Sequence, residues 1–189
     1  MTRQAVHEAP TIETERLVLR AYRLEDFPHL AAAWADPEVV RYIGGRPSTE
    51  EESWTRLLRN SALWTMLGYG YWAATEKTTG RYAGDVGFAD FKREIEPSIK
   101  GVPEIGWVLA PWSHGRGYAT EAAQAALRWL ESARGPQRTV CIIDDGNLAS
   151  LRVAEKCGYR EFARTQYKGS NVVMLERGAG VTVSVEPKP

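Results

Sequence analysis

The chain has 189 residues, of which 43% are hydrophobic, and its 24 Lys and Arg residues balance its 24 Asp and Glu residues. This size and composition favour a single domain with one core over residues 1–189. A net charge of zero argues against broad binding to nucleic acid or to an anionic membrane. We find no long apolar run and no secretory signal, and therefore expect a cytoplasmic protein.

The predicted secondary structure mixes strands and helices. Gly, Pro and polar clusters separate segments with strand or helix periodicity. In chain order we expect a strand over 17–22, helices over 25–35 and 50–66, strands over 71–75, 81–91 and 104–110, a helix from Gly117, a strand over 139–143, a short helix after Asn147, and a closing hairpin of 162–167 with 171–176. The order predicts a mixed α/β fold. The ends, 1–11 and 178–189, are expected to be mobile.

The two cysteines have no spacing typical of a metal site or a redox pair. Cys141 falls on a predicted strand and Cys157 near the end of a predicted helix. We interpret both as reduced packing residues and expect no metal.

The segment from Glu104 to Leu130 joins an apolar strand to an amphipathic helix through a glycine turn. The helix begins near Gly117, where its first N–H groups have no partner within the helix. Gly115 and Gly117 allow these donors to approach a phosphate closely, which favours a diphosphate ligand. A P-loop would need Lys and then Ser or Thr after Gly117, and a dinucleotide motif would need glycine at Thr120. Taken alone, the turn is also compatible with an ordinary strand-to-helix connection.

A second informative segment runs from Asp145 to Tyr159. Asn147 precedes a short helix and is typical of an N-cap residue, whose side chain accepts an N–H from the first turn. Ser150 has the position of a first-turn hydroxyl. Gly158 is expected to end the helix.

Together these segments resemble the GNAT superfamily of acyl-CoA-dependent N-acyltransferases. The family's pyrophosphate loop has the pattern Gln/Arg-x-x-Gly-x-Gly/Ala, and residues 114–119 read HGRGYA, with His114 departing at the first position. Residues 14–43 resemble the RimJ/RimL-like branch through TERLVLR and DPEVVRY, and residues 147–159 match N-x-x-S-x-R-V-x-E-K-x-G-Y/F. The resemblance covers roughly residues 12–177.

The resemblance implies an α/β (α+β) GNAT fold. Its central sheet is mixed, mostly antiparallel and of six to seven strands, is flanked by about four helices, and splays between the fourth and fifth strands, 104–110 and 139–143. Acetyl-CoA is the implied co-substrate, with its pantetheine arm entering this gap. The implied cofactor-binding residues are Trp107, Val108 and Leu109 through their backbone, the loop residues His114, Gly115, Arg116, Gly117, Tyr118, Ala119 and Thr120, and Asn147 with Ser150.

The chemistry that the resemblance implies is direct attack of a neutral amine on the acetyl thioester. Glu104 is the candidate base, because many GNAT enzymes carry a carboxylate at the start of this strand. The Tyr that protonates the departing thiolate in many of them is replaced by Ala154, so Ser150 is the candidate donor near the sulfur. Trp34 and Tyr42 are the candidate acceptor-binding residues, since the first helix and the loop after it form the acceptor wall in related folds.

Other interpretations stay open at the level of sequence. The acceptor is either a protein N-terminal α-amine or a small-molecule amine, and the protein is a monomer or a homodimer. A non-catalytic acyl-CoA-binding sensor of the same fold is the main alternative. A module that binds ATP or NAD through the glycine turn is disfavoured by the motif mismatches described above.

Overall fold

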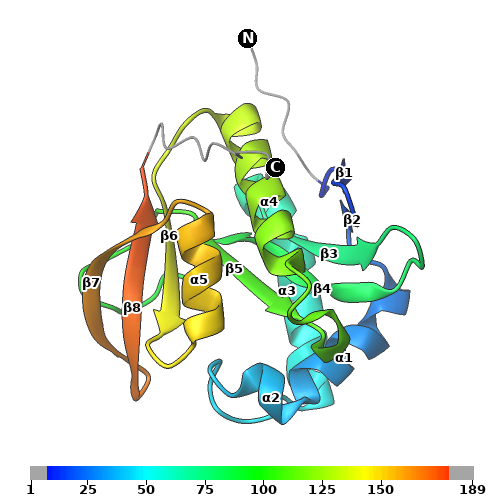
Figure 1. Cartoon of the computed structure of the whole chain (residues 1–189), viewed down its shortest axis with the longest axis horizontal. Helices are drawn as coiled ribbons and strands as arrows, with labels where there is room; N and C mark the ends of the chain where they lie inside the picture. Colours follow the sequence, from blue (N-terminus) through cyan, green and yellow to red (C-terminus); the bar gives the residue numbers. More distant parts are fainter. Residues whose placement is uncertain (1–7, 179–189) are drawn as a thin grey trace, which may run out of the picture.

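The computed structural model describes residues 8–178 (Figure 1). Most of the two ends expected to be mobile, 1–11 and 178–189, therefore lies outside the described residues. The part that is described at the N-terminal side is held in place. The Pro10 carbonyl accepts a hydrogen bond from Trp72 Nε1 at 2.8 Å, and Ala9 packs against the hydrophobic core.

The mixed α/β fold expected from the sequence is confirmed. The strands are β1 (Ile12–Glu13), β2 (Leu17–Arg20), β3 (Tyr71–Glu76), β4 (Tyr82–Ala89), β5 (Glu104–Leu109), β6 (Thr139–Asp144), β7 (Arg160–Tyr167) and β8 (Ser170–Arg177). The helices are α1 (Phe27–Ala35), α2 (Pro37–Val40), α3 (Glu50–Leu67), α4 (Tyr118–Arg134) and α5 (Leu148–Lys156), with 3-10 turns at η1 (Leu24–Asp26) and η2 (Pro111–Ser113). The elements not expected are β1 and α2, which at 2 and 4 residues are too short for a periodic pattern to predict.

All the strands belong to one sheet, in the order β1-β2-β3-β4-β5-β6-β8-β7. Neighbouring strands pair antiparallel except β5 and β6, which are parallel. Over the described residues these two strands pair at one position, Glu104 with Val140. Beyond it they diverge, as Figure 1 shows, and the β5 backbone edge is left without a partner strand. The predicted splay between the fourth and fifth expected strands is therefore confirmed.

The helices cover both faces of the sheet because successive side chains of a strand point to opposite faces. Trp72 of β3 faces α4, where its ring makes an edge-to-face contact with Trp129 of α4 at a centroid distance of 5.1 Å. Trp64, near the C-terminal end of α3, contacts the same ring at 4.6 Å. Ala73, the next residue, packs on the other face in a cluster with Leu30 of α1 and with α3. Figure 1 shows α4 in front of β3 to β5, with α1 and α3 behind them. Elements of both layers therefore border the gap beside β5.

Candidate active site

A glycine turn leads from β5 through η2 into helix α4. Gly115 and Gly117 have φ values of +72° and +80°, in the left-handed region that favours glycine. A Cβ atom added at Gly115 would meet nothing within 4 Å. Glycine is therefore favoured here by the backbone conformation and not by a lack of space. Gly117 is the N-cap of α4, and no side chain in residues 8–178 caps this helix end. Its first N–H groups therefore face outward with the positive end of the helix dipole. These groups belong to Tyr118, Ala119 and Thr120.

Residues just before β2 fasten the glycine turn to the sheet. Arg16 donates from Nη1 to the Arg116 carbonyl at 2.8 Å and from Nε to Glu121 Oε2 at 2.7 Å. Thr14 Oγ1 donates to the other Glu121 oxygen at 2.6 Å. Burial opposes ionisation of Glu121, but these donors outweigh it and lower the pKa of the carboxyl group. These contacts of Thr14 and Arg16 with Glu121 were not predicted from the sequence, although both residues lie within the TERL pattern.

The side chains of Arg116 and His114, both expected at the cofactor, contact the protein itself. Arg116 Nη2 lies 3.1 Å from Glu76 Oε1, and the Tyr118 hydroxyl donates to the same oxygen at 2.6 Å. His114 Nε2 lies 2.9 Å from the carbonyl oxygen of Leu109. The turn thus presents backbone N–H groups with the guanidinium groups of Arg16 and Arg116 beside them, each paired with a carboxylate. The His114 imidazole is turned back toward the end of β5.

Trp107 and Ser150 meet between β5 and α5. Trp107 Nε1 donates to Ser150 Oγ at 3.3 Å, so its side chain joins the site as well as its backbone. Asn147 Oδ1 accepts the Ser150 backbone N–H at 3.1 Å, which confirms Asn147 as the N-cap of α5. The structure therefore brings the predicted residues Trp107, Asn147 and Ser150 together beside the unpaired edge that Val108 and Leu109 continue.

Glu104, the candidate base, lies where the gap begins and is 6% exposed. Its two oxygens accept hydrogen bonds from Arg93 Nε and Nη2 at 2.7 and 2.8 Å. Burial works against the charge of Arg93, but the Glu104 carboxylate outweighs it and raises the pKa of the guanidinium. Arg93 also lies against the rings of Phe91 and Tyr167, at 4.7 and 5.1 Å from their centroids. Sequence reasoning missed Arg93, because it lies in a polar stretch without periodicity.

Tyr71 brings an unanticipated hydroxyl to β5. Its side chain extends from β3 across β4, where Gly87 pairs with Gly106 of β5. A Cβ atom added at Gly87 would lie 2.8 Å from Tyr71 Cγ, and one added at Gly106 would lie 2.3 Å from Tyr71 Oη. Tyr71 is 8% exposed, and its hydroxyl makes no hydrogen bond within residues 8–178. Burial and then the Glu104 carboxylate raise the pKa of Tyr71, which keeps the hydroxyl neutral.

Trp34, a predicted acceptor residue, lies in the core with 8% exposure. Its Nε1 donates to Asp85 Oδ2 at 3.4 Å, and Arg56 Cζ lies 3.5 Å from its ring centroid. Asp85 also accepts hydrogen bonds from the hydroxyls of Tyr22 and Tyr82 at 2.7 and 2.5 Å. Burial raises the pKa of Asp85 in spite of these donors. The indole N–H and one ring face of Trp34 are thus already in contact with the protein.

Tyr42, the other predicted acceptor residue, is half-buried and lies beside the turn between β6 and α5. A Cβ atom added at Gly146 would lie 3.2 Å from Tyr42 Cε1. Gly146 directly precedes Asn147, the cap of α5. The structure therefore places Tyr42 near the α5 side of the gap, whereas Trp34 lies beneath α3.

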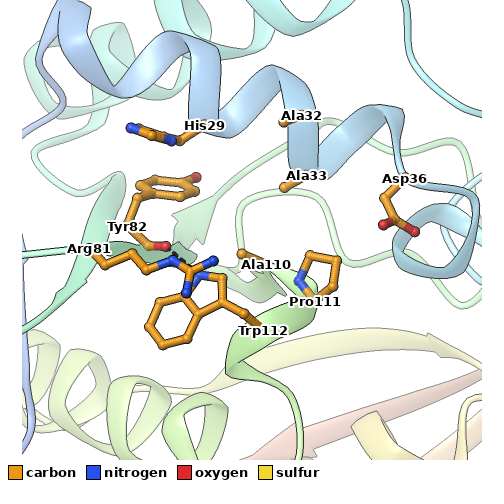
Figure 2. Close-up of a pocket in the computed structure, with 9 residues that line it drawn as sticks. All are labelled: His29, Ala32, Ala33, Asp36, Arg81, Tyr82, Ala110, Pro111 and Trp112. Carbon is orange, nitrogen blue, oxygen red and sulfur yellow. Dashed lines mark hydrogen bonds between the residues drawn. The ribbon is translucent and has the colours of Figure 1, made fainter.

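A hollow of about 270 Å³ lies between α1 and the segment that leaves β5 (Figure 2). Figure 2 shows the His29 ring above that of Tyr82, with centroids 6.2 Å apart. Arg81 Cζ lies 4.3 Å from the centroid of Trp112 on the opposite side. None of the predicted site residues lines this hollow. The candidate active site is therefore defined by the chemistry of the gap beside β5 and not by the hollow.

Both cysteines are free and buried, as the sequence predicted. Burial raises the pKa of Cys141 well above its usual value and that of Cys157 to about 12. In the described part of the chain, no three His, Cys, Asp or Glu side chains are grouped so as to hold a metal ion. No described helix has both the length and the apolar character needed to cross a membrane.

Comparison with known proteins identifies this arrangement. Residues 16–160 match the family described as acetyltransferase (GNAT) domain. The uncharacterized protein YkkB of Bacillus subtilis (strain 168) is 36% identical over 152 residues, which cover 77% of this chain and 82% of YkkB. The chain therefore belongs to the GNAT acetyltransferase family.

Solved structures agree with this family. An acetyltransferase from Agrobacterium tumefaciens str. C58 superimposes with a TM-score of 0.77 at 27% identity, covering 90% of this chain and 95% of that one. RimL, a ribosomal L7/L12 alpha-N-protein acetyltransferase solved in complex with coenzyme A, superimposes with a TM-score of 0.72, covering 92% of this chain and 100% of that chain. At 21% identity the likeness to RimL establishes the fold alone.

Proposed function

We propose that this protein transfers an acetyl group from acetyl-CoA directly to a primary amine. The observation that carries the proposal is the open edge of β5 beyond Glu104, which leads to a glycine turn and an uncapped end of α4. Peptide-like groups of a pantetheine arm are suited to an unpaired strand edge, and a diphosphate is suited to a helix N-terminus. Arg116 adds a cation beside the turn.

Acetyl-CoA supplies the activated acetyl group in this proposal. We assign the backbone of Trp107, Val108 and Leu109 to the pantetheine arm, as the family resemblance implies. His114 to Thr120 would hold the diphosphate through their backbone donors. One N–H of the β5 edge would then polarise the thioester carbonyl, which is the oxyanion-type stabilisation that acyl transfer requires.

The transfer itself exchanges one bond for another. The neutral amine attacks the thioester carbon, the C–N bond forms, the C–S bond breaks, and the amine proton passes to a base while the thiolate leaves. Deprotonating a lysine ammonium group, with pKa about 10.4, costs roughly 4 to 5 kcal/mol at pH 7. For an α-amine with pKa near 8 the same step costs about 1.4 kcal/mol. The acceptor that needs less help from a base is therefore an α-amine or another amine of low basicity.

Glu104 is the proposed base and Ser150 the proposed hydrogen-bond donor to the departing sulfur. Glu104 is held by Arg93, so an incoming amine has to compete with the guanidinium for a carboxylate oxygen. Ser150 Oγ accepts from Trp107, which leaves its own proton available for a thiolate. We add Tyr71 to this set, because its neutral hydroxyl lies at Gly106 on the strand that holds the thioester in this proposal.

The second candidate is an acyl-CoA-binding sensor that does not turn over. Two observations favour it, namely Ala154 in the position of the usual acid and the engagement of Glu104 by Arg93. The two candidates differ in one result. The enzyme releases CoA thiol in the presence of a suitable amine, whereas the sensor binds acetyl-CoA without transfer.

The first test is a thermal-shift titration with acetyl-CoA, CoA, ATP and NADH, followed by thiol release with a panel of amines. A ligand at about 100 times its dissociation constant adds roughly 2.7 kcal/mol of apparent stability. We expect stabilisation by acetyl-CoA and CoA alone, and a lower kcat for Ser150→Ala at saturating acetyl-CoA. Stabilisation by ATP or NADH instead would contradict the assignment of the phosphate site. Unchanged turnover of Ser150→Ala would remove Ser150 from the mechanism.

A further inference from the structure

The half-buried Arg56 and the exposed Arg59 of α3 are arginines whose carboxylate partners are absent among residues 8–178. Arg56 and Arg59 are three residues apart and so lie on the same side of the helix. Within residues 8–178 neither forms an ion pair with a carboxylate. By contrast, the half-buried Arg20 and Arg93 are paired with Asp26 and Glu104 at 2.7 Å.

The hydrogen bonds that Arg56 and Arg59 donate to side chains are long. Arg56 Nη1 donates to Ser48 Oγ at 3.3 Å, and Arg59 Nη2 donates to Asn60 Oδ1 at 3.3 Å. Burial and then the positive charge of Arg59 lower the pKa of Arg56, in spite of Asp85 and Glu52 nearby. Two guanidinium groups that repel each other, one of them half-buried, would be stabilised by an anion bound between them.

The arginine pair borders the face of β5 on which the proposed acceptor lies. Alternate residues of β5, namely Glu104, Gly106 and Val108, share this face. At one end, Arg59 lies 5.2 Å from the ring centroid of Phe91, and the same ring contacts Arg93, the partner of Glu104.

At the other end of this face, Arg56 covers Trp34, whose indole is bound to Asp85. Asp85 pairs in register with Val108 of β5. Asp85 is occupied by three neutral donors and makes no ion pair with Arg56 within the described residues. The hydroxyl of Tyr71 lies between the two ends, at Gly106.

We infer that the acceptor is a primary amine that also carries an anionic group, and that Arg56 and Arg59 bind this group while the amine lies against β5. The inference rests on the proposed acetyl transfer and adds the substrate class to it. Guanidinium groups bind carboxylates and phosphates through paired, charge-assisted hydrogen bonds. The anion is therefore a carboxylate or a phosphate, on a small molecule or next to the N-terminus of a peptide.

The test measures kcat/KM by CoA thiol release for amines in matched pairs. The pairs are glycine and glycinamide, O-phosphoethanolamine and ethanolamine, and the peptide amides Ala-Asp-Phe and Ala-Asn-Phe, which separate the possible sources of the anion. We expect the anionic member of at least one pair to exceed the neutral member about tenfold or more. Equal values within all pairs would overturn the inference and leave the proposed function intact.

Variants assign the preference to the arginine pair. Arg56→Gln and Arg59→Gln are expected to reduce the ratio of anionic to neutral kcat/KM about tenfold each, and Arg56→Lys to retain part of it. Arg128→Gln, an exposed arginine of α4 with the same change of charge, is expected to keep the wild-type ratio. A fall in the melting temperature of Arg56→Gln with an unchanged ratio would show that Arg56 only supports Trp34, and would contradict the inference.

A failure of the proposed function gives a different result. If acetyl-CoA stabilises the protein but no amine releases thiol, the transferase proposal is wrong. The arginine pair is then tested by calorimetry on the CoA-loaded protein with N-acetylglycine and N-acetylglycinamide. Tighter binding of the acid, lost in Arg59→Gln, supports an anion site, and equal binding overturns it.

Discussion

The hydroxyl oxygen of Tyr71 lies over Gly106, so close that a Cβ atom at Gly106 would stand 2.3 Å from it. Tyr71 and Gly106 belong to β3 and β5, with β4 between them. Glycine at positions 87 and 106 leaves a path for the ring over β4. This relationship places a neutral hydroxyl, without a hydrogen-bond partner among residues 8–178, against the strand whose edge is open beyond Glu104.

Tyr71→Phe removes that hydroxyl and keeps the ring. We expect kcat/KM for the acceptor to fall about tenfold, because one hydrogen bond to the substrate is lost, while the dissociation constant of acetyl-CoA stays unchanged. Steady-state kinetics and calorimetry check this. Tyr69→Phe is the matched control, since Tyr69 is equally buried and belongs to the core on the α4 face. Equal kinetics for both variants would show that the Tyr71 hydroxyl has no part in transfer.

Glu104→Gln separates a base from a structural ion pair. As the base, Glu104 is expected to contribute about 100-fold to kcat, and its loss leaves acetyl-CoA affinity unchanged. The substitution also leaves Arg93 without its charged partner, which is expected to destabilise the fold by about 3 kcal/mol. Thiol release and denaturant unfolding measure the two effects separately. If Glu104→Gln is less stable but keeps the full kcat at a temperature where it is folded, Glu104 has a structural role alone.

Gly115→Ala tests the proposed role of the glycine turn in binding the diphosphate. Alanine in the left-handed region costs about 1 kcal/mol, and the added methyl group meets no atom, so strain is the expected effect on stability. Relief of that strain moves the turn, and we expect acetyl-CoA to bind about tenfold more weakly by calorimetry.

The control for this experiment is Gly169→Ala in the β7–β8 hairpin. Gly169 has a φ of +87° and equally open space, so its stability loss is expected to be the same. Gly169 lies outside the glycine turn, so the acetyl-CoA affinity of Gly169→Ala is expected to equal that of the wild type. An equal loss of affinity in both variants would mean that stability, and not the turn, controls binding.

Asp26→Asn tests the buried ion pair that joins β2 to the start of α1. Asp26 is 4% exposed and accepts from Arg20 at 2.7 and 2.8 Å and from the Arg23 N–H at 2.8 Å. Burial opposes its ionisation, but these donors outweigh it and lower the pKa of Asp26.

The pKa of Asp26 is lower in the folded state than in the unfolded state, where it is about 4. The stabilisation by Asp26 is therefore complete above the pKa of the unfolded state and is lost as the pH falls through the pKa of the folded state. We expect Asp26→Asn to lose about 3 kcal/mol of unfolding free energy at pH 7, with the difference from wild type shrinking toward pH 3. Urea unfolding at both pH values checks this, with the exposed Glu25→Gln as control. A difference that is the same at pH 3 and pH 7 would contradict the role of the charge.

Local features of the site were predictable from the sequence. The glycine turn, the start of α4 and the Asn147 cap depend on backbone preferences of a few adjacent residues, and short-range patterns report them directly. The gap between β5 and β6 followed from the family resemblance. Nearly all of the strands and helices followed from periodicity, except β1 and α2, which are too short to show one.

The tertiary structure alone decided which side chains meet. Arg16 and Glu121 are 105 positions apart, and no periodic pattern links residues at that separation. The same holds for Tyr71 over Gly106, for Arg93 on Glu104, and for the burial of Trp34 beneath Arg56. Such contacts depend on how strands order themselves in the sheet and how helices cover it, and a small gain from each of many distant contacts sets that arrangement. The sequence by itself determined a glycine turn on a GNAT-like chain, whereas only the fold decided which polar groups lie beside β5.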